Sequence, residues 1–395
     1  MNLVIVGHID HGKSTLIGRL LFDTKSLPKE KLEEIEASCK ALGKEMEFAY
    51  VVDALEEERK NEMTIDTTQT FFQTEKREYV IIDTPGHKEF IKNMITGSSY
   101  ADVAILIVDV SEGMKEQTKR HAYILKLLGI GQVIVVINKM DKVNYEKGRF
   151  DKIKEEVLNF LETIGVTPLC VIPISAFKGD NVVTKSINMK WYDGKTLVKV
   201  LDELEEKKRR EYYFRLPIQD VYEINGEKIA VGNIISGEVK RGDKVKIYPS
   251  DEDAAVLKIL ESNKEIEMVR YPKSVGIALD KQIKRGDILA KGERPVVVQK
   301  LEANIFCIDK IEEGQEYSFA CVTQEVEAKV VEIKEKINPD TLERESGKSL
   351  GEGDVGRVVL EFQNPVVIEK FGNVVELGRF VLKKNAIIIA GGTIR

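Results

Sequence analysis

The sequence of 395 residues lacks paired cysteines and long apolar runs. Its four cysteines are far apart and form no CxxC motif, so we expect reduced core residues and neither disulfides nor a zinc site: Cys39, Cys170, Cys307 and Cys321. No apolar run approaches the roughly 20 residues that span a membrane. The residues before the first glycine loop are too few for a signal peptide. We therefore expect a cytoplasmic protein that does not enter membranes.

Neither sign of charge dominates the composition. The 60 basic and 66 acidic residues give a net charge of −6, which argues against a chain whose whole surface binds nucleic acid. The composition does not exclude nucleic-acid binding by one local basic face. The contents of 43% hydrophobic and 32% charged residues are ordinary for a globular protein. The length suits two or three domains of roughly 100–200 residues each.

The first half of the chain alternates β-branched apolar runs with amphipathic segments. The runs predict strands over 2–7, 78–84, 103–110, 132–138 and 169–175, and the segments predict helices over 14–23, 116–128 and 148–163. Buried strands that alternate with helices predict a mostly parallel sheet covered on both faces. We assign this α/β domain to residues 1–210.

The second half changes to short strands separated by turn signals such as Asn225-Gly226. It contains no long helical pattern, repeat or low-complexity tract. Two consecutive β-rich units of roughly 80 to 100 residues each predict two small all-β barrels. We place them at residues 211–294 and 295–395.

The motif GHIDHGKST, residues 7–15, fits GxxxxGK[ST] and lies between a predicted strand and a predicted helix. Its glycines allow backbone N–H groups to close around a β-phosphate. Lys13 supplies a charge to the phosphate oxygens, and Ser14 supplies a hydroxyl to Mg²⁺. Gly347-Lys348-Ser349 looks similar, but Leu342 stands where the first glycine belongs, so we reject it as a second phosphate loop.

Three further motifs follow in order at the ends of predicted strands. Asp83 can hold a Mg²⁺-bound water, and the Gly86 amide can reach a γ-phosphate. Asp141 can accept hydrogen bonds from guanine N1 and its 2-amino group, which adenine cannot satisfy. Ser175-Ala176 can turn backbone amides toward guanine O6. The combination predicts a GTP site made of Gly7, His8, Ile9, Asp10, His11, Gly12, Lys13, Ser14, Thr15, Asp83, Thr84, Pro85, Gly86, Asn138, Lys139, Met140, Asp141, Ser175 and Ala176.

The stretches DTPGHKEFIKNMITGSS (83–99) and ERKNEMTID (58–66) extend these motifs. With them, the whole chain resembles the translational-factor class of P-loop GTPases: an α/β P-loop GTPase domain followed by two small β-barrels. The resemblance implies GTP or GDP and Mg²⁺ as cofactors. It gives His87 the role of orienting the attacking water, and Mg²⁺ the ligands Ser14, Thr64 and, through water, Asp83. Glu62-Met63 departs from the Gly-Ile that this class often has before the threonine.

Within this class, GRLLFDTKSLPKEKLEEIE (18–36), GDVGRVVLEFQNPV (353–366) and GRFVLKKNAIIIAGGTIR (378–395) resemble the large subunit of the heterodimeric sulfate adenylyltransferase. That resemblance implies that GTP hydrolysis drives adenylyl sulfate formation by a smaller catalytic partner of the ATP-pyrophosphatase type. Residues 296–395 contain 13 basic and 17 acidic residues, a net charge of −4 that disfavours contact with a tRNA backbone.

The alternative is an elongation-factor-like GTPase that delivers aminoacyl-tRNA. Histidine at positions 8 and 11 favours it, because the sulfate-activating branch commonly has serine and aspartate there. We expect sulfate activation and keep tRNA delivery as the alternative, with tRNA a partner only in that case.

Overall fold

The computed structural model describes most of the chain: residues 1–27, 33, 48, 69–82, 101–127, 129–204, 213–224, 226–262, 264–338, 343–370 and 373–394. Internal contacts divide the chain into two compact units. The described residues up to 204 belong to the first unit, and those from 213 onward belong to the second. Within the described ranges, every helix is too short or too polar to cross a membrane.

The first unit is built on a six-stranded sheet in the order β2-β3-β1-β4-β5-β6. Its strands are β1 (Asn2–Gly7), β2 (Gln69–Gln73), β3 (Glu78–Ile82), β4 (Val103–Asp109), β5 (Val133–Asn138) and β6 (Cys170–Pro173). All pairings are parallel except β2 with β3. Every residue of β4 and β5 is buried, as expected for strands covered on both faces.

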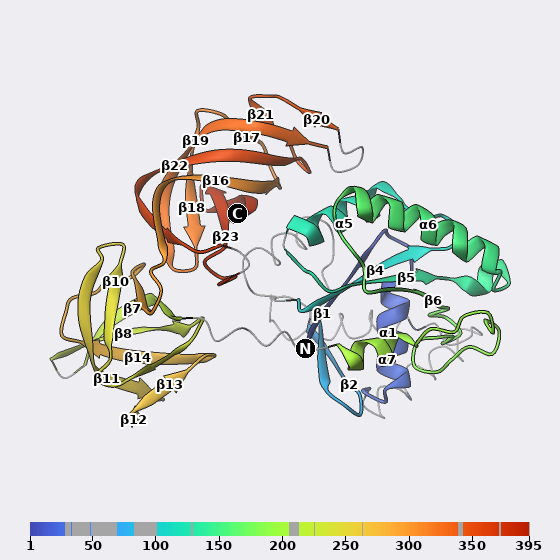
Figure 1. The fold of residues 1–395 in the computed structure, drawn as a ribbon, viewed down its shortest axis with the longest axis horizontal. Helices are drawn as coiled ribbons and strands as arrows, with labels where there is room; N and C mark the ends of the chain where they lie inside the picture. The colour runs from blue at the N-terminus through green and yellow to red at the C-terminus, as the bar shows by residue number, and fades with distance from the viewer. Residues whose placement is uncertain are drawn as a thin grey trace. The chain divides into compact units, whose positions relative to one another are not determined.

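The helices of this unit are α1 (Lys13–Asp23), α5 (Glu116–Leu127), α6 (Lys147–Thr163) and α7 (Leu197–Glu203), with a 3₁₀ turn η1 (Met140–Val143). Figure 1 shows α1 and α7 on one face of the sheet and α5 and α6 on the other. Leu16 and Leu20 of α1 and Leu201 of α7 share a core with alternate strand residues such as Leu3 and Ile5. The alternation of side chains along a strand explains why the opposite set faces α5 and α6.

The second unit contains two barrels. The first has β7 (Phe214–Ile224), β8 (Glu227–Ile234), β10 (Lys244–Tyr248), β11 (Glu252–Glu261), β14 (Lys273–Leu279) and β15 (Ile288–Lys291), with β12 (Lys264–Ile266) beside β11 and the small pair β9 (Glu238–Lys240) and β13 (Met268–Arg270). The order β10-β15-β7-β8-β14-β11 closes because β10 also pairs with β11. Closure leaves the ring of strands without an edge.

The second barrel has β16 (Val296–Cys307), β18 (Glu316–Cys321), β19 (Gln324–Ile337), β22 (Val355–Ile368), β23 (Arg379–Lys384) and β24 (Ile387–Ile394), with β20 (Arg344–Glu345) beside β19 and the pair β17 (Ile311–Glu312) and β21 (Ser349–Leu350). Pairing of β18 with β19 closes it. Its core extends into the first barrel through Ile235, Tyr248, Ile288 and Ala290. The predicted fold class is confirmed, while the boundaries at 210 and 294 stay a prediction.

Candidate functional site

The phosphate loop connects β1 to α1, and two glycines shape it. Gly12 has φ +93°, a left-handed conformation that favours glycine. A Cβ on Gly12 would lie 2.4 Å from Asn138 Nδ2, and one on Gly7 would lie 2.4 Å from the Ile107 carbonyl oxygen. The loop therefore packs against the ends of β4 and β5 at distances that only glycine permits.

Lys13, the first residue of α1, folds back over this loop. Its Nζ donates to the carbonyl oxygens of Gly7 at 3.0 Å and of His8 at 2.9 Å. Ser14 and Thr15 follow in the first turn of the helix, where unpaired amides and the helix dipole favour an anion. This is the arrangement that a phosphate loop requires.

Asn138, the last residue of β5, joins the phosphate loop to the loop after β6. Its Nδ2 donates to the His11 carbonyl oxygen at 2.9 Å, and its Oδ1 accepts from the Ala176 amide at 2.9 Å. Ser175 Oγ lies 2.5 Å from Asp141 Oδ1 and donates a hydrogen bond to it. The phosphate loop, the end of β5 and the loop after β6 thus meet at the carboxyl end of the sheet, although the first and the last of them are more than a hundred residues apart in the chain.

The two histidines of the phosphate loop lie side by side, with ring centroids 5.2 Å apart. His11 is fully buried, its Nδ1 lies 3.4 Å from the Ile107 carbonyl oxygen, and its Nε2 has no hydrogen-bond partner. Burial lowers the pKa of His11 to about 4, so the ring is neutral near pH 7. The approach of Glu112 to Nε2 at 4.0 Å is therefore not an ion pair at that pH.

Mg²⁺ in nucleotide sites is usually held by one or two protein oxygens together with substrate phosphates. Ser14 fits this role, since its hydroxyl is a hard oxygen ligand directly after Lys13 in the first turn of α1. The other predicted ligands and γ-phosphate residues lie outside the described part of the chain, as does the predicted catalytic residue: Thr64, Asp83, Thr84, Pro85, Gly86 and His87.

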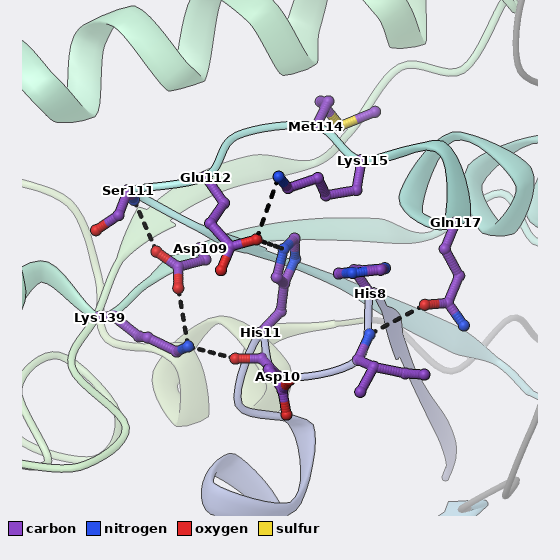
Figure 2. A network of polar contacts seen from close by, with 12 residues as sticks. His8, Asp10, His11, Asp109, Ser111, Glu112, Met114, Lys115, Gln117 and Lys139 are labelled. Carbon is purple, nitrogen blue, oxygen red and sulfur yellow. Dashed lines mark hydrogen bonds and ion pairs between the residues drawn. The ribbon is translucent and has the colours of Figure 1, made fainter.

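A polar network that the sequence motifs did not predict lies beside the phosphate loop (Figure 2). Lys139 Nζ lies 2.8 Å from Asp109 Oδ2 and also donates to the Asp10 carbonyl oxygen. The Ile9 amide donates to Gln117 Oε1 at 3.0 Å. Asp109 is the last residue of β4, as Asn138 is the last residue of the neighbouring β5. A carboxylate at this strand end could therefore have been predicted from the sequence to lie near the phosphate loop.

Comparison with known proteins agrees with this geometry. The family model for the elongation factor Tu GTP binding domain matches residues 1–207, and the model described as GTP-eEF1A C-terminal domain-like matches residues 300–395. Elongation factor 1-alpha of Methanopyrus kandleri is 40% identical over 416 residues, which cover 99% of this chain and 96% of that protein. The chain belongs to the elongation factor 1-alpha family. The match to a GTP-binding domain implies that GTP and GDP are its nucleotides.

Other members of the elongation factor 1-alpha family show the same full-length similarity. The protein of that name from Methanothermobacter thermautotrophicus is 39% identical over 406 residues, and that from Methanoculleus marisnigri is 37% identical over 407 residues. In both cases the alignment covers 99% of this chain and 96% of the relative. The family assignment therefore includes the barrels as well as the GTP-binding domain.

These relatives overturn the sulfate-activation hypothesis and the smaller catalytic partner that it required. The net charge of −4 in the last barrel did not distinguish the two branches, because net charge does not say where charges lie. The histidines at positions 8 and 11 were the better guide.

Proposed function

We propose that this protein is an elongation-factor-like GTPase that binds GTP and delivers aminoacyl-tRNA in its GTP-bound state. One observation carries the proposal: 37–40% identity to proteins named elongation factor 1-alpha, over 99% of this chain in each of the three relatives described above. Similarity over the barrels matters most, because a shared GTP-binding domain alone would leave the partner open.

The phosphate end of the site is proposed to work through Lys13, Ser14 and the loop amides. Lys13 already lies across the loop, so its charge is in place for the β- and γ-phosphate oxygens. Mg²⁺, when bound, supplies a positive charge that offsets the negative charge developing on the phosphates. Ser14, Thr64 and, through a water, Asp83 are the proposed ligands, and His87 is proposed to orient the attacking water.

The base end is proposed to select guanine through Asp141. Ser175 donates to one oxygen of this carboxylate, which fixes its orientation toward the base before the nucleotide arrives. Asn138 holds the Ala176 amide and the phosphate loop in register at the same time. An adenine in this site would offer the Asp141 carboxylate neither of the two donors that guanine supplies, and such a loss costs far more than a missing methylene would.

The proposal is tested by titrating fluorescently labelled aminoacyl-tRNA with the full chain. Tight binding is expected with a non-hydrolysable GTP analogue, with much weaker binding when GDP replaces it or when the tRNA is uncharged. Raising the salt concentration should weaken the complex, since phosphate contacts release counterions. Equal affinity in the GTP and GDP states, or no binding in either, would reject tRNA delivery.

A further inference from the structure

An ion pair between Asp109 and Lys139 lies beside the phosphate loop (Figure 2). Asp109 is the last residue of β4 and is 1% exposed. Its Oδ2 lies 2.8 Å from Lys139 Nζ, and its Oδ1 accepts from the Ser111 amide at 2.7 Å. Both carboxylate oxygens are therefore engaged inside the protein, and Asp109 is too deep to contact a nucleotide itself.

This carboxylate is ionised at neutral pH. Burial alone would raise the pKa of Asp109, but the hydrogen bonds from Lys139 and the Ser111 amide outweigh it and hold the pKa below its usual value. A buried charge requires a partner, because removal from water is costly. Lys139 is that partner, so the position of its ammonium group is set by Asp109.

Lys139 is itself part of the nucleotide site. It stands between Asn138 and Asp141 in the sequence, its backbone has φ +64°, and its side chain is 19% exposed. Its Nζ also donates to the Asp10 carbonyl oxygen, and Asp10 has φ +65° in the phosphate loop. One ammonium group thus ties the end of β4 to the phosphate loop.

We propose that Asp109 is a positioning residue for the guanine nucleotide. It fixes the Lys139 side chain, and through it the phosphate loop at Asp10, in the arrangement that binds GDP and GTP before either arrives. This rests on the nucleotide site proposed above. Preorganisation of this kind raises affinity by lowering the ordering cost of binding, and it slows nucleotide release.

The test is a double-mutant cycle on the full chain with a fluorescent GDP analogue. Asp109→Asn is expected to release the analogue about tenfold faster than wild type, the loss typical of one hydrogen bond to a charged group. Lys139→Met is expected to release it faster as well. In the Lys139→Met background, Asp109→Asn is expected to add little, because its only route to the nucleotide is gone.

Glu156→Gln is the matched control. Glu156 Oε1 accepts from the Met114 amide at 3.1 Å, so this carboxylate holds the same loop after β4 without touching Lys139. Glu156→Gln is expected to release the GDP analogue at the wild-type rate.

In single-turnover hydrolysis, Asp109→Asn should raise the GTP concentration needed for half-saturation and leave the rate at saturation unchanged. Melting curves will identify variants that fail to fold.

Three results would overturn the inference: wild-type release from Asp109→Asn, an undiminished effect of Asp109→Asn in the Lys139→Met background, or equally fast release from Glu156→Gln. Failure of the proposed nucleotide site looks different. In that case wild type itself would not retain the GDP analogue, whatever residue 109 is. Conversely, a wild type that retains GDP but ignores Asp109→Asn leaves the site standing and removes Asp109 from it.

Discussion

At the scale of single residues, Asn138 does more than its place in a base-recognition motif suggests. It is 2% exposed, and its amide group joins the phosphate loop to the Ser175-Ala176 turn. The glycine at position 12 leaves just enough room for that amide. The residues proposed to recognise the base and those proposed to recognise the phosphates therefore share one buried connection.

Asp141 is proposed to carry the base specificity, and Asp141→Asn tests this role. We expect GTP affinity to fall at least about a hundredfold, because the amide cannot accept both guanine donors. Xanthosine triphosphate, which lacks the 2-amino donor, should become the preferred nucleotide. Competition between the two nucleotides for the variant measures this. Asp151→Asn, an exposed carboxylate on α6, should leave the preference for GTP unchanged, and an unchanged preference in Asp141→Asn would refute the base-recognition argument.

At the scale of elements, polar contacts between residues far apart in the sequence help to hold the first unit together. The local hydrophobic pattern of the sequence does not reveal such contacts. Asp202 of α7 accepts from Thr74 Oγ1 at 2.7 Å and from Tyr79 OH at 2.8 Å, which ties α7 to the β2–β3 hairpin. The sequence pattern did not predict β2. This strand is short, and it is an antiparallel edge strand in a sheet where only buried parallel strands have a strong apolar signal.

The two barrels are joined by a buried ion pair as well as by a shared core. Arg215 of β7 is 2% exposed, and its Nε donates to Glu369 Oε1 at 2.9 Å. Its other nitrogens donate to backbone oxygens of the first barrel, including that of Glu293 at 2.6 Å. Because the pair is hidden from water, loss of one partner leaves an uncompensated charge.

Arg215→Met should therefore destabilise the barrels by about 3–5 kcal/mol. Combining it with Glu369→Leu should recover much of the loss, since an apolar pair of similar volume often replaces a buried ion pair. Urea unfolding followed by circular dichroism reports the whole chain, while fluorescence of Trp191, the one tryptophan, reports the first unit, so a loss seen by circular dichroism alone belongs to the barrels. Arg270→Met, which breaks an exposed pair with Glu238, serves as the control and should have a much smaller effect. Equal effects of Arg215→Met and Arg270→Met would contradict this role.

At the scale of the whole molecule, apolar periodicity and turn chemistry were enough to predict an α/β unit followed by two barrels. The predicted motif residues that the structure describes lie together because each group follows a strand, and parallel strands bring their carboxyl ends to one edge. The role of Asp109 was not predicted because its partner, Lys139, follows another strand 30 residues later in the chain. The choice between sulfate activation and tRNA delivery was predicted wrongly because both branches share the fold, and a domain's net charge does not locate its binding surface.

The measurement that tests the central claim most directly is the lifetime of the aminoacyl ester. A carrier that holds aminoacyl-tRNA in its GTP-bound state should shield the ester from water. We expect spontaneous deacylation of a mixture of aminoacyl-tRNAs to slow markedly when the full chain and a non-hydrolysable GTP analogue are present, and to proceed at its free rate with GDP. Deacylation at the same rate in both nucleotide states would contradict the account.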